Sequence, residues 1–202
     1  MRRIAIVLLL LAHAAARAAQ AQAPAPAQAP ARLPACAQAV RFTADWFADP
    51  PQEFDKTSDF LVKQGAPAAE GSTALGLVTV DNAISVVPEK TCRGLRVALK
   101  FVHPVLRVIR DLPAGTCAHA HVLRHEHTHV LIYREMARQF RALVYPFPDT
   151  ATAEDVLRYA RQQLAQLQQQ QREFDSPEEY ARNLTACRGE IPKLLAASRK
   201  GG

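Results

Sequence analysis

Two histidines and a glutamate in the middle of the chain have the types and the spacing of a metal-dependent hydrolytic site. They are His125, Glu126 and His129, in the segment His125-Glu126-His127-Thr128-His129. Residues four apart on a helix lie on one face, close enough for two imidazoles to share one metal ion. Glu126 is rotated by about 100° from His125 and can reach a water in an open position of that ion. Zinc brings the pKa of such a water near neutrality, so that a carboxylate can take its proton.

This H-E-x-x-H segment resembles the active-site helix of the zincin superfamily of zinc peptidases. The layout of the chain, with a leader, a strand-rich half and then this helix, is also similar to small bacterial families of predicted secreted zinc-dependent proteases. The resemblance implies one Zn²⁺ ion, with His125 and His129 as ligands and Glu126 as the catalytic general base.

A third zinc ligand must come from elsewhere in the chain. Glu135 occupies the position of the third ligand in metzincin-type zincins, but Ile132 replaces the glycine of that pattern. Gluzincin-type zincins take a glutamate from the following helix. If that helix runs back antiparallel, residues 167–173 come level with His129, and Glu173 is the acidic residue among them. We therefore predict Glu173 as the third ligand. The alternatives are Asp175, Glu178 and Glu179.

Five of the seven histidines lie between His119 and His129. His121 is about 12 Å from His129 along a straight helix, too far to share the same ion, so we predict a second-shell role for it. The cluster also supports an alternative function, a non-catalytic periplasmic metal-binding protein. A third alternative is an envelope structural or interaction protein in which the motif is accidental.

Helical signals continue from Cys117 to the C-terminus. No Pro or Gly occurs between Thr116 and Tyr145, and Thr116 is the expected N-cap. After Pro146-Phe147-Pro148, a second helix is expected with Asp149 or Thr150 as its cap. Its predicted buried stripe consists of Leu157, Ala160, Leu164, Leu167, Gln171 and Phe174. Ser176-Pro177 begins a third helix, which Gly189 and Pro192 break or kink.

Strand-like segments fill the N-terminal half, at residues 39–43, 73–80, 83–87, 95–102 and 105–109. Asp81-Asn82 separates two β-branched runs, which predicts a hairpin turn there. Pro104 interrupts the last run, so residues 105–109 are expected at a sheet edge. The predicted fold class is α+β: a small antiparallel sheet packed against the H-E-x-x-H helix and two further C-terminal helices. In zincins an edge strand aligns the substrate, a role that we assign by resemblance to residues 95–102.

The four cysteines, Cys36, Cys92, Cys117 and Cys187, are widely spaced and contain no C-x-x-C pair. An even number in an exported chain predicts two disulfides. Three pairings are open. The division into two halves favours Cys36–Cys92 in the strand-rich half and Cys117–Cys187 in the helical half.

The first residues are typical of a cleavable signal peptide. Arg2 and Arg3 precede an apolar run that is about half the length of a membrane span, followed by small residues around Ala19-Gln20-Ala21. We predict a signal peptide at 1–21, a disordered Ala/Pro/Gln-rich linker at 22–35 and one metallopeptidase domain at 36–202. The mature protein is then periplasmic or secreted, without a stable membrane anchor.

The composition bears on the partners of this domain. The formal net charge is +6, but three of the arginines that contribute to it lie in the leader. The remaining charge is too small to indicate a nucleic-acid partner. The expected partner is a peptide or protein substrate in the cell envelope, and the sequence fixes neither the substrate nor the oligomeric state.

Overall fold

The computed structural model describes residues 33–46, 48–66 and 73–201. The predicted signal peptide and residues 22–32 of the predicted linker lie outside the described residues. The first strand begins at Ala35, one residue before the predicted start of the domain.

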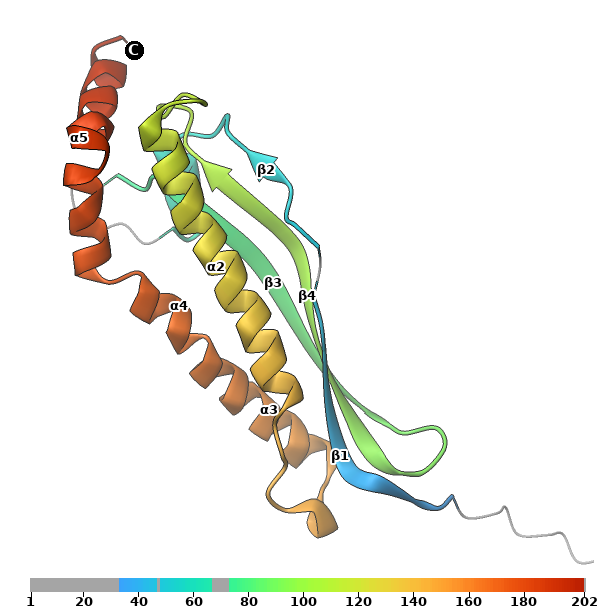
Figure 1. Cartoon of the computed structure of the whole chain (residues 1–202). Helices are drawn as coiled ribbons and strands as arrows, with labels where there is room; N and C mark the ends of the chain where they lie inside the picture. The colour runs from blue at the N-terminus through green and yellow to red at the C-terminus, as the bar shows by residue number, and fades with distance from the viewer. Residues whose placement is uncertain (1–32, 47, 67–72, 202) are drawn as a thin grey trace, which may run out of the picture. The chain divides into compact units, whose positions relative to one another are not determined.

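A mixed sheet forms the N-terminal half of the domain (Figure 1). Its centre is the long strand β4 (Arg93–Val108), which pairs antiparallel with β3 (Gly76–Pro88). On its other side β4 pairs parallel with β1 (Ala35–Asp45) and then with the short β2 (Gln52–Glu53). The α+β class is confirmed, but the sheet is not purely antiparallel. The chain reaches β4 from β1 through β2, α1 (Ser58–Lys63) and β3, and this long crossover permits a parallel pair.

The turn predicted at Asp81-Asn82 is wrong, because β3 continues through both residues, which are exposed. The chain instead reverses between β3 and β4, where the Glu89 N–H donates to the Gly94 carbonyl over 2.9 Å. Val80 lies opposite a bulge in β4 that contains His103, whose φ is 50°. A bulge tolerates residues that are otherwise rare in strands, including the N–H-deficient Pro104 that follows.

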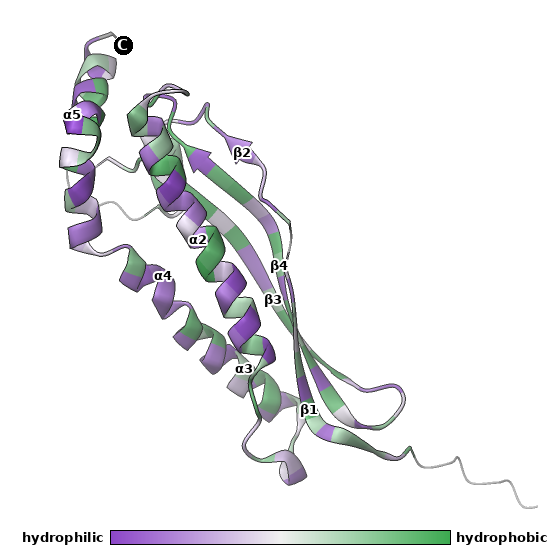
Figure 2. Ribbon diagram, in the orientation of Figure 1, coloured by the Kyte–Doolittle hydropathy of each residue, from purple (hydrophilic) through white to green (hydrophobic). Residues whose placement is uncertain are grey.

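Both of the strand segments that we placed at an edge lie in the centre of the sheet. Residues 95–102 and 105–108 belong to the single strand β4, which has β3 on one side and β1 or β2 on the other. Hydrophilic and hydrophobic residues alternate along much of β4 (Figure 2), a pattern that reports one-sided burial but not the number of neighbouring strands. The predicted substrate-aligning role of residues 95–102 is therefore excluded by the pairing.

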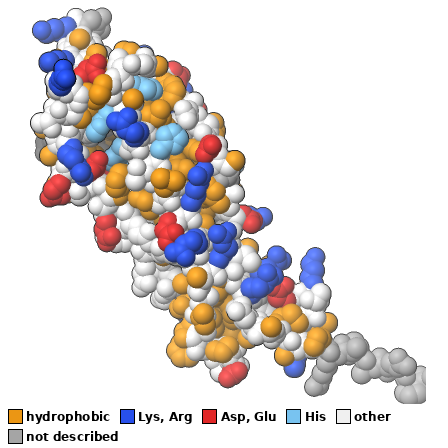
Figure 3. All heavy atoms as spheres, viewed as in Figure 1, with side chains coloured by type: hydrophobic (Ala, Val, Ile, Leu, Met, Phe, Trp, Pro, Cys, Tyr) orange, Lys and Arg blue, Asp and Glu red, His pale blue; other side chains and the backbone are white. Residues whose placement is uncertain are grey.

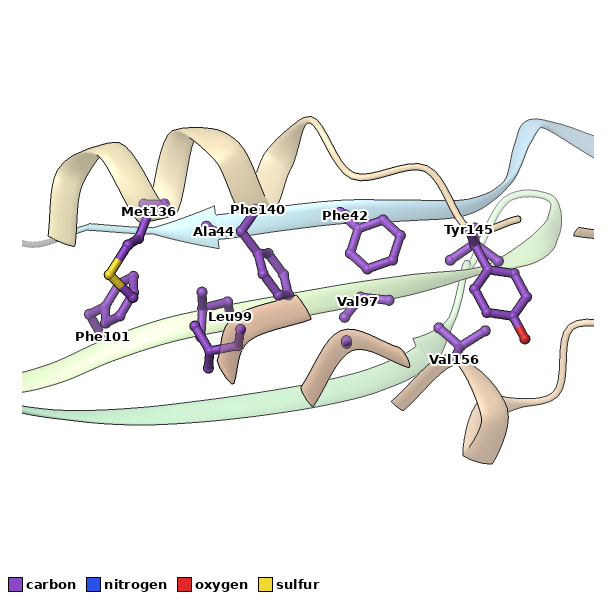
Figure 4. Packing of buried hydrophobic residues seen from close by; sticks show 13 residues of the cluster. Phe42, Ala44, Val97, Leu99, Phe101, Met136, Phe140, Tyr145 and Val156 are labelled. Carbon is purple, nitrogen blue, oxygen red and sulfur yellow. The ribbon is translucent and has the colours of Figure 1, made fainter. Parts of the chain in front are cut away.

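Helix α2 (Cys117–Arg141) packs on this sheet and carries the H-E-x-x-H residues. Its predicted cap is confirmed: the Thr116 hydroxyl accepts from the His119 N–H over 3.1 Å. Towards its C-terminal end, Phe140 is fully buried and meets Phe42 of β1 edge-on, with ring centroids 5.5 Å apart (Figure 4). Truncating such a buried ring typically costs about 3–5 kcal/mol. Val122 and Val130 anchor the N-terminal part in a second apolar cluster.

The remaining helices return along α2. After the 3₁₀ turn η1 (Pro148–Thr150), α3 (Ala153–Leu167) begins at the cap Thr152, two residues beyond the nearer of the two predicted caps. It is followed by α4 (Gln169–Phe174) and α5 (Pro177–Gly201). The predicted break in the last helix is confirmed, since residues 186–189 of α5 have non-helical backbone angles. Figure 1 shows α3 and α4 running back antiparallel to α2.

Two disulfides tie these elements together. Cys36–Cys92 joins the start of β1 to the turn before β4, and Cys117–Cys187 joins the first residue of α2 to the break in α5. The favoured pairing is therefore confirmed, and disulfides of this kind fit a protein exported from the cytoplasm. Within the described residues, none of the helices has the length and apolar character needed to cross a membrane.

Candidate metal centre

His125 and His129 lie one helical turn apart on the face of α2 that looks towards α4 and the start of α5. Their Nε2 atoms are 3.2 Å apart. Asp175, the residue that follows α4, places its Oδ1 atom 3.2 Å from Nε2 of His125 and 3.0 Å from Nε2 of His129. Three metal-ligating atoms from two segments of the chain therefore converge on one point.

The other nitrogen of each imidazole faces an acceptor. Nδ1 of His129 lies 2.6 Å from Oε1 of Gln171, whose amide orientation is set because its Nε2 donates to the His129 carbonyl over 3.2 Å. Nδ1 of His125 lies 3.4 Å from Oε1 of Glu179. In neutral imidazoles both Nδ1 atoms then carry the proton, and both Nε2 atoms present lone pairs. Two lone pairs and a carboxylate oxygen within about 3 Å of one another repel unless a proton or a cation lies between them.

The triangle of ligand atoms fits a small tetrahedral ion. With metal–ligand bonds of about 2.0–2.1 Å, tetrahedral geometry separates neighbouring ligands by about 3.3 Å. The three observed separations are 3.0, 3.2 and 3.2 Å. Two imidazoles and one carboxylate are a donor set that zinc accepts, and three protein ligands leave a fourth position for water.

Without a cation, protonation relieves the repulsion. Burial lowers the pKa of both His125 and His129, but the hydrogen bonds to Asp175, the negative charge of Glu126 and the hydrogen bonds to Glu179 and Gln171 together outweigh it, so that both pKa values lie above the usual value. Burial raises the pKa of Asp175, and the two histidines more than reverse this effect, lowering it to about 2. The site thus favours positive charge on the imidazoles beside an ionised carboxylate, which is the electrostatic environment that also suits a bound cation.

Glu126 is buried beside this triangle, with 4% of its surface exposed. Burial raises its pKa to about 7, against the smaller effects of His129, His125 and the Val78 backbone, which lower it. The fit against β3 is close: a Cβ atom added to Gly76 would lie 2.4 Å from Oε1 of Glu126. A side chain at position 76 is therefore incompatible with the observed place of Glu126.

A pocket of about 980 Å³ opens over these residues. It is lined by His125, Glu126, His129 and Asp175, by residues 73–78 and by the side chains of α5. Histidine side chains gather on the face seen in Figure 3, over the N-terminal half of α2 and beside α5. Tyr180 of α5 is at the wall of the pocket, and its pKa is raised to about 12 by burial and by the negative charges of Asp175 and Glu126. Its hydroxyl therefore keeps its proton and remains a hydrogen-bond donor.

Residues 116–181 match a family described as "Bacterial protein of unknown function (DUF922)". This segment runs from the cap of α2 into the first turn of α5, so it contains the three converging residues and Glu126 but not Gly76. No curated protein and no solved structure matches the chain. The family description assigns no activity, so the functional argument depends on the geometry of the site.

Glu173, which we predicted as the third ligand, is exposed and lies outside the converging group. The reason is helical phase. Gln171 faces His129, so the residues three and four positions later, Phe174 and Asp175, share its face, and Glu173 points away. Phe174 stacks on the His125 ring at 4.7 Å between centroids. The stripe predicted from Leu157 to Phe174 includes Gln171, and Asp175 lies four residues after Gln171 on the same face.

The other histidines near the motif have separate partners. Nε2 of His121 lies 2.8 Å from Oδ1 of Asn183, so it joins α2 to α5 beside the site without touching His125 or His129. His119 is buried, with Nδ1 3.0 Å from the Leu112 carbonyl. Within the described residues, the remaining group with metal-ligating atoms contains Cys117 and Cys187, whose sulfurs are joined in a disulfide.

Sequence reasoning missed Gly76, Gln171 and Tyr180 as members of this site. Gly76 occurs in a strand-like run, where a glycine can mark the close approach of another group. Gln171 was placed on the buried stripe, and a buried amide requires hydrogen-bond partners. For Tyr180 we find no signal in the sequence that separates it from other surface tyrosines.

Proposed function

We propose that this protein is a zinc-dependent peptidase that acts in the periplasm or outside the cell. The observation that supports the proposal best is the convergence of Nε2 of His125, Nε2 of His129 and Oδ1 of Asp175 within 3.2 Å, with Glu126 buried next to them in the same pocket. A purely structural histidine pair needs no such carboxylate on the adjacent face of the helix.

Each residue has a role in this proposal. Zinc bound by the three ligands would polarise the scissile carbonyl and acidify the attacking water. Glu126 takes the proton from that water as its oxygen bonds to the carbonyl carbon, and returns it to the amine nitrogen as the C–N bond breaks. The Tyr180 hydroxyl is a donor to the oxygen that becomes negative during attack.

Strand β3 takes the place of residues 95–102 as the proposed guide for the substrate backbone. Among the described residues, β3 pairs only with β4, so its outer edge has no strand partner. The Leu75 carbonyl accepts from Ile109, on the β4 side. Because backbone groups alternate along a strand, those of Ala74, Gly76 and Val78 face the outer edge. An extended peptide can hydrogen-bond to the free groups of Ala74 and Gly76.

The location in the cell envelope is supported by the two disulfides together with the signal-like first residues. The proposed substrate is accordingly a peptide or protein of the envelope or the surroundings of the cell.

One pair of variants tests the proposal. Glu126→Gln should keep about one zinc per chain and lose nearly all cleavage of a quenched fluorescent peptide library. His129→Ala should lose the zinc itself. Glu135→Gln is the matched control, because Glu135 is on the same helix but pairs with Arg138 away from the site. Both zinc content and cleavage should survive in this control.

The alternative function, non-catalytic metal binding, predicts a different result. A wild-type protein that binds zinc but cleaves no peptide, with Glu126→Gln indistinguishable from it, would support that alternative. A wild-type protein that takes up no zinc would overturn both functions.

A further inference from the structure

The pocket extends beyond the proposed metal centre into an apolar region. Val122 lies one turn before Glu126 on α2, and Ile191 belongs to α5; their exposed fractions are 3% and 2%. Leu195 lines the same region, and Leu184, with 65% of its surface exposed, stands at its opening. By the helical rise, Val122 is about 4.5 Å along the α2 axis from His125. The apolar region therefore begins at about the distance that separates neighbouring residues of an extended peptide, so it can receive a side chain next to the scissile bond.

The charged residues that line the pocket in the described part of the chain are acidic or are histidines. They include Glu126 and Asp175, and no Lys or Arg is among them. Away from the proposed zinc ion, a substrate carboxylate in the apolar region would lose its hydration and would meet no Lys or Arg side chain in return. An uncharged apolar side chain of the substrate can be buried in this region without such an electrostatic cost.

The backbone that lines the pocket continues to both sides of Gly76, which is the first residue of β3. Residues 73–78 all line the pocket, and Gly76, which contacts Glu126, lies within this stretch. At about 3.3 Å per residue the stretch covers roughly 20 Å, enough for about six extended substrate residues. β3 covers only the side of Gly76 that leads to Val78, and residues 73–75 line the pocket on the other side, so together they can hold substrate residues before and after the bond to be cleaved.

From these three features we infer that the apolar region, formed by Val122, Leu184, Ile191 and Leu195, is a specificity subsite for a large uncharged apolar side chain adjacent to the scissile bond. The substrate is an internal segment of a peptide, and residues with carboxylates next to the bond are disfavoured. This inference rests on the proposed peptidase function and names the class of substrate for the same site.

The test compares capped hexapeptides, acetylated and amidated at their ends, that differ only in a central Leu or Glu. Cleavage by the zinc-loaded mature protein and binding to zinc-loaded Glu126→Gln are both measured. We expect the Leu peptide to be preferred by about tenfold or more in each assay. A Leu peptide whose chain ends with a free carboxylate on the residue after the scissile bond should be cleaved more slowly than the same peptide with an amidated end.

A charge placed at the opening should shift this preference. Leu184→Lys is expected to reduce the Leu-over-Glu preference by about tenfold, because it brings a cation to the apolar wall. Leu131→Lys is the control: Leu131 is also exposed, at 57%, but it does not line the pocket. Both substitutions are on helix surfaces, so neither should prevent folding.

The outcomes separate this inference from the proposed function. Cleavage without any preference for Leu, or a Leu184→Lys variant that behaves like Leu131→Lys, would overturn the subsite and leave the peptidase intact. Selective binding of the Leu peptide without cleavage by the wild type would support the subsite and count against the peptidase. Equal binding of both peptides, with no cleavage, would overturn both.

Discussion

Gly76→Ala should disable the site without touching a metal ligand. The added Cβ would lie 2.4 Å from Oε1 of Glu126 and 2.7 Å from its Cδ and Cγ atoms. Unstrained contacts of this kind are about 3.5 Å or longer, so the carboxylate must move by about 1 Å. A misplacement of 1 Å in a catalytic group can cost about 100-fold in rate. His125, His129 and Asp175 keep their positions, so zinc affinity should change little.

The assay is kcat/KM for a fluorescent peptide, measured beside zinc content. We expect Gly76→Ala to lower kcat/KM by about 100-fold, mainly through kcat, with one zinc per chain retained. The overlap is expected to lower the free energy of unfolding by about 1–3 kcal/mol. Replacing a strand glycine by alanine offsets part of this cost, by about 0.5–1 kcal/mol.

A double-mutant cycle shows whether Gly76 acts through Glu126. In the Glu126→Gln background the carboxylate is already inactive as a base, so Gly76→Ala should cause little further loss of activity. The reasoning is refuted if Gly76→Ala alone keeps more than about one third of the wild-type activity. It is also refuted if the losses in the two single variants multiply in the double variant.

Four further predictions concern the metal and the fold. Asp175→Asn should weaken zinc binding by about 100-fold or more, while Glu173→Gln leaves it unchanged, as measured by competition with a chromophoric chelator; equal effects would contradict the assignment of Asp175. Zinc affinity should fall steeply below neutral pH, by up to about 100-fold per pH unit, because zinc requires neutral imidazoles and the pKa values of His125 and His129 are raised. A further prediction concerns the metal-free protein, in which His125 and His129 each form an ion pair with Asp175. These ion pairs stabilise the fold most between pH 3.8 and pH 6.5, the usual pKa values of an aspartate and a histidine. This contribution is lost as the pH rises through the raised histidine pKa values and as it falls towards the Asp175 pKa of about 2. Chemical denaturation of the chelator-treated protein from pH 3 to pH 9 measures it, and a flat profile would count against these ion pairs. Finally, replacing both Cys117 and Cys187 by Ser should lower the free energy of unfolding by about 4 kcal/mol, as expected for a disulfide that closes a loop of 70 residues. A loss below about 1 kcal/mol in urea denaturation would show that α5 is held without it.

The local features of the helical half could be read from the sequence because short-range rules govern them. Thr116 caps α2, and Ser176 caps α5 by accepting from the Glu179 N–H over 3.2 Å. Both effects depend on residues within one turn of each other. The i, i+4 spacing of His125 and His129 likewise needs only the regular geometry of a helix.

The strands were harder to place, since their neighbours are remote in the sequence. Asp81-Asn82 resembles a turn, but pairing with β4 and the bulge at His103 keep both residues in the strand. The alternating pattern of β4 reports which face is buried, and it carries no information on how many strands flank it or in which direction they run.

The sequence by itself determined the class of fold and the helix that carries the motif. It favoured, without deciding, the disulfide pairing that forms, and it placed residues 167–173, two positions short of Asp175, level with His129. Only the tertiary structure decided which carboxylate meets the two histidines and what surrounds Glu126. Asp175 reaches the histidines because α3 and α4 return antiparallel at one particular rotation, in which Gln171 faces His129. Gly76 matters because β3 packs against the adjacent face of α2. Such contacts depend on the rotation and separation of whole elements, which no local pattern of residues encodes.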